Sequence, residues 1–319
     1  MKFKKYLSVN ILWLWLIFSY YLCIQGAFCS EKPTYHTVRD LPENLILLWK
    51  QFPDIVETSK IIERDYYFAN VYHDFLWTGS IISKQLPYSI GFTFNNTFAI
   101  ITKQDNFYPV VPFKKTYSDY PDITEDTIRA KSLNIKDEIL KIWKFSVSPP
   151  AITKIHLEHG DCWNVVFNRL EDNLYPYFGD GLFMVMEPSG KLFSLKVRYC
   201  KPRPSKLEVK LSKQEASYIG EPHAIRCLQY MFPDFEPKFY VESAELIIIS
   251  PAYHFSPSGT DIVTRNQEDV SLFWQVVFTL KERIYINKSE NSYFDTKKII
   301  IYLDPETGDF ICWDTVSSL

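Results

Sequence analysis

One cluster of side chains has the residue types and spacing for metal or acid–base chemistry. The segment His156-Leu157-Glu158-His159-Gly160-Asp161 brings two imidazoles close to carboxylates, and these groups are common ligands of catalytic zinc. On an extended strand, however, His156 and Glu158 would share one face while His159 points to the other. We therefore expect surface polar residues at a strand end. A metal-dependent hydrolase using His156, Glu158 and His159 is the alternative.

The cysteines are the second candidate for chemistry. Cys162, Cys200, Cys227 and Cys312 follow the N-terminal segment without any CxxC pair, which argues against a zinc site. Cys162 opens a Trp-led strand and Cys200 closes the last strand of the same repeat, so antiparallel neighbours would bring them to bridging distance. We predict a Cys162–Cys200 disulfide rather than a nucleophile beside His159, because exported thiols oxidise. Cys227 and Cys312 are expected to pair or to be buried.

No other motif indicates catalysis. The sequence contains neither the GxSxG nucleophile elbow of many hydrolases nor the HExxH motif of zinc peptidases. We therefore expect no catalytic residue, no bound metal and no cofactor, and a protein that is not an enzyme.

The N-terminal segment 1–29 is typical of an export signal. Three lysines among the first five residues precede a nearly uncharged run, Tyr6 to Ile24, and small residues follow around Gly26 and Cys29. Cleavage after Cys29 or Gly26 is the preferred interpretation. Retention as an N-terminal anchor is the alternative, because the run is long enough to span a bilayer. Either way, we expect an extracytoplasmic protein, secreted or periplasmic, that meets the membrane only through this segment.

Charge restricts the partners further. Removing the N-terminal segment leaves 32 basic against 38 acidic residues, a net charge of -6. An acidic chain of this kind does not suit nucleic acid. Its densest basic run, Lys201, Arg203, Lys206 and Lys210, is expected to be a solvated linker.

A repeated pattern organises the strands that would position these residues. Trp163–Phe167 is followed by a turn at Glu187–Gly190, and Trp274–Phe278 by a turn at Asp304–Gly308. In each turn Pro pre-sets φ, and Gly takes the left-handed conformation that closes a hairpin. The residues expected to have structural roles in this repeat are Trp163, Gly190, Trp274, Asp304 and Gly308.

Helices are expected ahead of both repeats. Thr124 can cap a helix that runs to Lys144, and Ser212 with Glu215 forms a capping box before the second helix. Gly220 and Pro222 are expected to break that second helix.

These patterns predict an α+β fold of tandem modules, each a helix packed on an antiparallel sheet, after a signal or anchor segment. The expected boundaries are 1–29 for the signal or anchor, 30–122 for an N-terminal α+β region, 123–204 for the first module and 205–319 for the second.

The second module resembles the PepSY domain, a small unit of exported proteins and peptidase propeptides. The resemblance extends from Leu207 to Asp314 and, less closely, from Ile123 to Tyr199, where the turn is one residue shorter. The residues that carry it are Ser212, Glu215, Ala216, Trp274, Val276, Phe278, Ile301, Leu303, Asp304, Thr307, Gly308 and Ile311.

The resemblance implies a non-catalytic function. PepSY modules are regarded as inhibitory or chaperoning when they are linked to peptidases. We therefore expect an exported module that binds a protein or peptide, with a peptidase-restraining or chaperoning role, through an exposed sheet face or edge strand. A structural envelope protein is a further alternative.

Overall fold

A computed structural model describes most of the chain after the N-terminal segment. The described residues are 32–69, 72, 74–83, 87–103, 123–157, 160–233, 236–249, 270–282, 284–287, 292–294 and 296–317. The predicted signal or anchor segment lies outside them. No helix within these ranges has the length and apolar character needed to cross a membrane.

Strands dominate the part of the chain that the structure describes, which also contains helical elements of 3 to 19 residues. The helical elements are η1 (Val38–Asp40), η2 (Glu43–Leu45), α2 (Ile46–Trp49), α3 (Glu125–Ile139) and α4 (Lys213–Met231). The strands up to the predicted module boundary are β1 (Lys60–Ala69), β2 (Asp74–Ile82), β3 (Pro87–Thr93), β4 (Phe98–Lys103), β5 (Ser146–Val147), β6 (Ala151–Leu157), β7 (Gly160–Glu171), β8 (Tyr175–Met186) and β9 (Leu192–Arg198). The later strands are β10 (Phe239–Ile249), β11 (Ser271–Leu280), β12 (Ile284–Asn287), β13 (Ser292–Phe294), β14 (Thr296–Leu303) and β15 (Phe310–Ser317).

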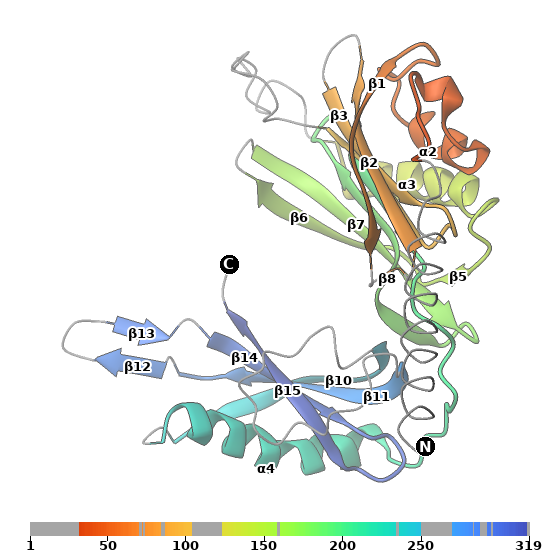
Figure 1. The fold of residues 1–319 in the computed structure, drawn as a ribbon. Helices are drawn as coiled ribbons and strands as arrows, with labels where there is room; N and C mark the ends of the chain where they lie inside the picture. The colour runs from red at the N-terminus through yellow and green to blue at the C-terminus, as the bar shows by residue number, and fades with distance from the viewer. Residues whose placement is uncertain are drawn as a thin grey trace, which may run out of the picture.

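Most strands belong to one 13-stranded sheet with the order β1-β2-β3-β4-β9-β8-β10-β11-β14-β15, while β7 pairs with β8 and carries β5 and β6 (Figure 1). We call β1–β9 the first strand group and β10, β11, β14 and β15 the second strand group. Within each group neighbouring strands are antiparallel. The groups meet where β8 and β10 run parallel, with Tyr177 opposite Ile248.

The predicted fold class of tandem helix-on-sheet modules is therefore wrong. The strands of the predicted first module have no sheet of their own, because β4 pairs with β9 from Phe98↔Arg198 to Thr102↔Ser194. The β8–β10 contact then continues the same sheet into the second strand group. An open strand edge offers unpaired backbone groups that any other strand can satisfy, and periodicity along the chain does not reveal which strand does so.

Each strand group has its own apolar core. In the first, Leu48 of α2 and Ile128 of α3 are buried with Trp77 and Val165 of the strands. In the second, α4 lies against β11 and β14 (Figure 1), and buried residues of these three elements form one cluster. The members of this second core with no exposed surface are Ala216, Ala224, Leu228, Val276, Phe278, Ile299, Ile301 and Leu303.

The two tryptophans of the repeated pattern lie at matching register positions. Trp163 of β7 is opposite Met186, the last residue of β8 before its turn, and Trp274 of β11 is opposite Leu303, the last residue of β14. Both indoles are buried. The Trp274 Nε1 donates to the carbonyl of Leu211 at 3.2 Å, so this ring also holds the chain just before α4.

Both turn glycines have left-handed backbones and lie against helical or pre-helical side chains. Gly190 has φ +72°, and a Cβ there would be 2.4 Å from Ile123 Cδ1; Gly308 has φ +80°, and its Cβ would be 3.0 Å from Ile219 Cδ1. The Asp304 Oδ1 accepts from the backbone N–H of Thr307 at 3.0 Å. Glycine therefore relieves both backbone strain and crowding in each turn.

The caps of both long helices follow the sequence prediction, but the break in α4 does not. Thr124 caps α3, and Ser212 and Glu215 form the capping box of α4. The helix α4 then continues through Pro222 to Met231. The helix packs closely on the sheet here, since a Cβ added to Gly220 would lie 3.3 Å from Phe278 Cζ. This packing holds the helix together across Pro222, which would interrupt an isolated helix.

We expect Trp274→Ala to destabilise the protein by about 3–5 kcal/mol, because it removes a buried ring and leaves a cavity. Urea unfolding followed by circular dichroism measures this change. Tyr218→Ala, on the exposed side of α4, is the matched control and should change stability by less than about 0.5 kcal/mol. Equal midpoints for the two variants would contradict the packing described for Trp274.

Candidate functional site at the junction of the strand groups

A wide bulge in β8 creates the candidate site. The β7–β8 pairing is regular at Leu170↔Pro176 and at Asn168↔Gly181. Between these two pairs, β8 has the segment Tyr177–Asp180 where β7 has only Arg169. Gly179 has φ +75° and Gly181 φ +143°. A Cβ on Gly181 would be 2.1 Å from the carbonyl oxygen of Phe167. The bulge therefore depends on glycine at its end, where the two backbones approach too closely for a side chain.

The bulge is also where the second strand group attaches. Tyr177 lies opposite Ile248 of β10, and both side chains are fully buried with Val270 and Leu272 in a small apolar cluster. Tyr177, the first residue of the bulge, is thus also the residue of β8 that pairs with β10.

Asp180, inside the bulge, is a carboxylate with no exposed surface. Its Oδ2 accepts from the backbone N–H groups of Cys200 at 3.0 Å and Lys201 at 2.8 Å. Its Oδ1 accepts from the Cys200 thiol at 3.2 Å. Hydrogen bonds of this kind compensate a buried charge for its lost hydration.

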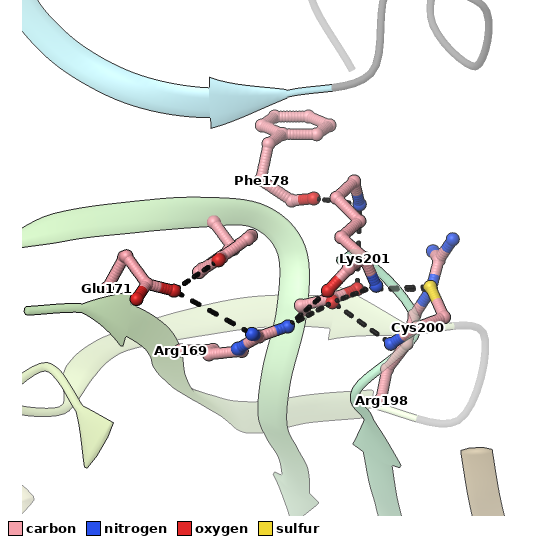
Figure 2. Close-up of polar contacts among 8 residues, drawn as sticks. Arg169, Glu171, Phe178, Arg198, Cys200 and Lys201 are labelled. Atoms are coloured by element: carbon pink, nitrogen blue, oxygen red, sulfur yellow. Dashed lines mark hydrogen bonds and ion pairs between the residues drawn. The ribbon is translucent and has the colours of Figure 1, made fainter. Parts of the chain in front are cut away.

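Three cations surround the same carboxylate. Arg169 Nη1 lies 3.4 Å from Asp180 Oδ2, while Arg198 Nε lies 3.6 Å and Lys201 Nζ 3.5 Å from Oδ1. We call Arg169, Asp180, Arg198, Cys200 and Lys201 the junction cluster (Figure 2). Burial lowers the pKa of Lys201, although Asp180 partly offsets this effect. One carboxylate thus serves as the shared counter-charge of three basic groups.

Arg169 is fixed from both sides by aromatic rings. Its guanidinium carbon lies 3.9 Å from the ring centroid of Tyr177 and 3.9 Å from that of Tyr199. Tyr199 in turn stacks on Phe145 at 5.3 Å. The guanidinium also donates to the carbonyl of Lys201 at 2.6 Å. Stacking and hydrogen bonding together leave Arg169 a single orientation.

The basic run after β9 is solvated, as its sequence indicates, at Arg203, Lys206 and Lys210, but not at its first residue. Lys201 is buried in the junction cluster. Arg203 pairs with Glu171 and Asp172, each at 3.1 Å.

The later lysines of this linker pair with the second strand group. Lys206 and Lys210 both contact Glu306, in the turn after β14. The backbone N–H groups of Lys210 and Leu211 donate to the carbonyl of Pro305 at 3.0 Å. The linker, residues 199–212, is thus bound to both strand groups in succession.

A pocket of about 720 Å³ opens beside the junction cluster. Its lining consists of Arg169 and Glu171 from β7 together with residues 199–203 of the linker. Glu171 accepts a hydrogen bond from the Tyr177 hydroxyl, which helps to raise the pKa of Tyr177 together with burial, the larger cause.

The junction cluster does not resemble a nucleophilic or acid–base centre. Burial, with the nearby Asp180 charge, raises the pKa of the Cys200 thiol, so this sulfur is protonated at neutral pH and a weak nucleophile. The carboxylate of Asp180 is fully engaged by donors. The arrangement is suited to holding backbone in place and to presenting fixed positive groups to the pocket.

The predicted Cys162–Cys200 disulfide is absent, and no disulfide joins the four cysteines of the described ranges. The prediction treated the two strands as antiparallel neighbours, whereas β7 and β9 lie on opposite sides of β8 and run in the same direction. Cys162 is at the start of β7 and Cys200 follows the end of β9. At about 3.3 Å per residue this places them roughly 25 Å apart, far beyond bridging distance.

The histidine cluster remains only partly placed. His156 lies on β6 opposite Asp161 of β7, while Glu158 and His159 lie outside the described residues. Within the ranges that the structure describes, no three His, Cys, Asp or Glu side chains gather in a way that could hold a metal ion. The metal-dependent alternative therefore remains an untested prediction.

The junction cluster itself was not predicted from sequence. Its local signal is Gly179-Asp180-Gly181, a carboxylate between two glycines inside an otherwise apolar strand. Glycine within a strand often marks a bulge or a close backbone approach. The cations could not be found in the same way, because they come from β7, β9 and the linker.

Comparison with known proteins adds little. No family model matches the chain, and no curated protein sequence matches it. Among solved structures, the Bacillus megaterium YpeB C-terminal domain superposes with a TM-score of 0.45 at 9% sequence identity, over 87% of this chain and 99% of that chain. Similarity at this level defines neither a family nor a function.

We expect Asp180→Asn to destabilise the protein by about 3–5 kcal/mol, because the isosteric amide leaves the surrounding cations without their counter-charge. Asp172→Asn is the matched control, since its carboxylate is exposed and pairs with Arg203 at the surface. That variant should change stability by less than about 0.5 kcal/mol. Urea unfolding measures both changes in stability. A similar loss of stability in the two variants would contradict the role given to the Asp180 charge.

Gly181→Ala should destabilise by about 2–5 kcal/mol, through a backbone conformation that alanine adopts poorly and a direct clash with Phe167. Gly91→Ala in β3 is the control, because an added Cβ there meets its nearest atom at an ordinary 3.5 Å. Its stability should change by less than about 1 kcal/mol. Thermal unfolding of both variants tests the bulge, and a Gly181→Ala melt equal to wild type would contradict it.

Proposed function

We propose that this chain is an exported, non-catalytic protein that binds a protein or peptide partner. Its N-terminal segment has the pattern of an export signal or anchor. The resemblance of residues 207–314 to PepSY modules supports a restraining or chaperoning role toward a peptidase. The junction cluster supports binding over catalysis, because its charged groups are engaged with one another.

The observation that carries the proposal is an exposed aromatic surface at the β1 side of the sheet. Tyr66 stacks on Phe75 at 4.9 Å, Phe68 meets Phe75 edge-on at 5.5 Å, and Tyr66 meets Phe94 at 6.2 Å. We call Tyr66, Phe68, Phe75 and Phe94 the β1 aromatic cluster. Phe68 is 45% and Phe94 41% exposed, so large apolar rings face solvent together.

The position of this cluster also favours a partner. The strand β1 is the terminal strand in the order of the 13-stranded sheet, and two more of its large apolar side chains, Ile62 and Tyr67, are exposed. Exposed apolar side chains on a sheet edge are typical of protein or peptide recognition. Aromatic residues are also enriched among those that contribute most to binding.

Replacing Phe68 and Phe94 by Ser should abolish partner binding, because it removes the exposed rings of the cluster. The experiment is affinity capture from the native extracytoplasmic fraction, quantified by mass spectrometry for wild type and Phe68→Ser/Phe94→Ser. A partner should be recovered with wild type and at least tenfold less with the variant.

Tyr218→Ser/Tyr230→Ser is the matched control, because it removes two exposed rings from α4 without touching β1. This control should retain the partner. Equal recovery with the β1 variant and wild type would contradict the proposed surface. Thermal melts of both variants show whether a loss of binding reflects unfolding.

A further inference from the structure

We propose that the junction pocket binds a carboxylate group of a peptide ligand, supplied by an acidic side chain. This site is separate from the β1 aromatic cluster. Its ligand chemistry follows from the charges and burial of the residues that line it.

The pocket lining is positively charged in a chain whose net charge is -3. Arg169, Lys201 and Arg203 line it against a single carboxylate, Glu171. Asp180, the counter-charge of Arg169 and Lys201, is fully buried and is not among the lining residues. The lining itself therefore carries three basic residues and one acidic residue, which leaves it net positive.

The inner cations are held in place before any ligand arrives. The side chains of Arg169 and Lys201 are 6% and 3% exposed, and the ring stack and the Asp180 contacts fix their positions. A donor that is already oriented loses little conformational entropy on binding. The inner wall of the pocket is thus a preorganised positive surface.

Arg203 supplies the adjustable contact at the rim. Its side chain is 64% exposed and pairs with two carboxylates, those of Glu171 and Asp172. The planar guanidinium suits bidentate recognition of a carboxylate. A ligand carboxylate can replace Asp172 as its partner, because a surface ion pair of this kind is worth little on its own.

The remaining features favour a peptide carboxylate over a phosphate. Glu171 keeps one negative charge in the lining, which opposes a dianion more strongly than a monoanion. Tyr199, a residue that is 40% exposed, also lines the pocket. Arg169 and Phe145 cover the two faces of its ring, so the apolar edge of the ring is what the stem of an acidic side chain would meet.

The test measures binding of a defined probe to the full-length chain by isothermal titration calorimetry. The probe is N-acetyl-glutamate methylamide, and its neutral match is N-acetyl-glutamine methylamide. The acid should bind saturably with a Kd of about 1 mM, and the amide at least about tenfold more weakly, because a single contact group gives modest affinity. Raising NaCl to about 0.5 M should weaken binding of the acid severalfold, because salt screens the charges.

Two variants test whether the measured binding takes place in the pocket. Arg203→Gln should lower the affinity for the acid at least about fivefold, since it removes the guanidinium at the rim. Lys206→Gln, in the same linker but outside the lining, should leave the affinity unchanged. Both replaced side chains are largely exposed, and thermal melts within about 2 °C of wild type would confirm intact folds.

Several outcomes would overturn the proposal. They are equal binding of acid and amide, no saturable binding up to about 20 mM, or an unchanged affinity in Arg203→Gln. Inorganic phosphate binding more tightly than the acid would reject the ligand class. None of these results bears on the β1 aromatic cluster, whose variants do not alter the pocket, so failure of one proposal is distinguishable from failure of the other.

Discussion

A carboxylate withdrawn from water lies at the point where the two strand groups meet. An unpaired charge in such a place costs several kcal/mol, so Asp180 is compatible with folding only if donors reach it. These donors come from β7, from β9 and from the linker that leads to α4. Segments that are distant in sequence must therefore all be in place before this one charge is compensated.

This requirement explains the local geometry of β8. The bulge turns Asp180 toward its donors, and glycine at position 181 lets the β8 backbone pass close to Phe167. The same bulge places Tyr177 opposite Ile248 of β10. The polar contacts of the cluster and the apolar contacts of Tyr177 thus act at one location, so the attachment of the second strand group depends on both.

The linker connects the junction cluster to the second strand group. Its first basic residues contact carboxylates of the first strand group, and its last ones contact Glu306 in the second. Trp274 then holds Leu211 just before α4 begins. Pairing of this kind leaves the charged groups of the linker with structural partners.

Features that depend on a few neighbouring residues were predictable from the amino-acid sequence. The caps of α3 and α4 follow from Thr124 and from Ser212 with Glu215, because a cap is a contact across three or four residues. The left-handed glycines of the two turns follow from equally local chemistry. Tertiary structure alone decided that β4 pairs with β9, that β8 meets β10, that β7 and β9 run in the same direction, and that Arg169 and Lys201 share Asp180. Side-chain periodicity reports which face of a strand is buried, but it does not identify the neighbouring strand, since every backbone edge offers the same donors and acceptors.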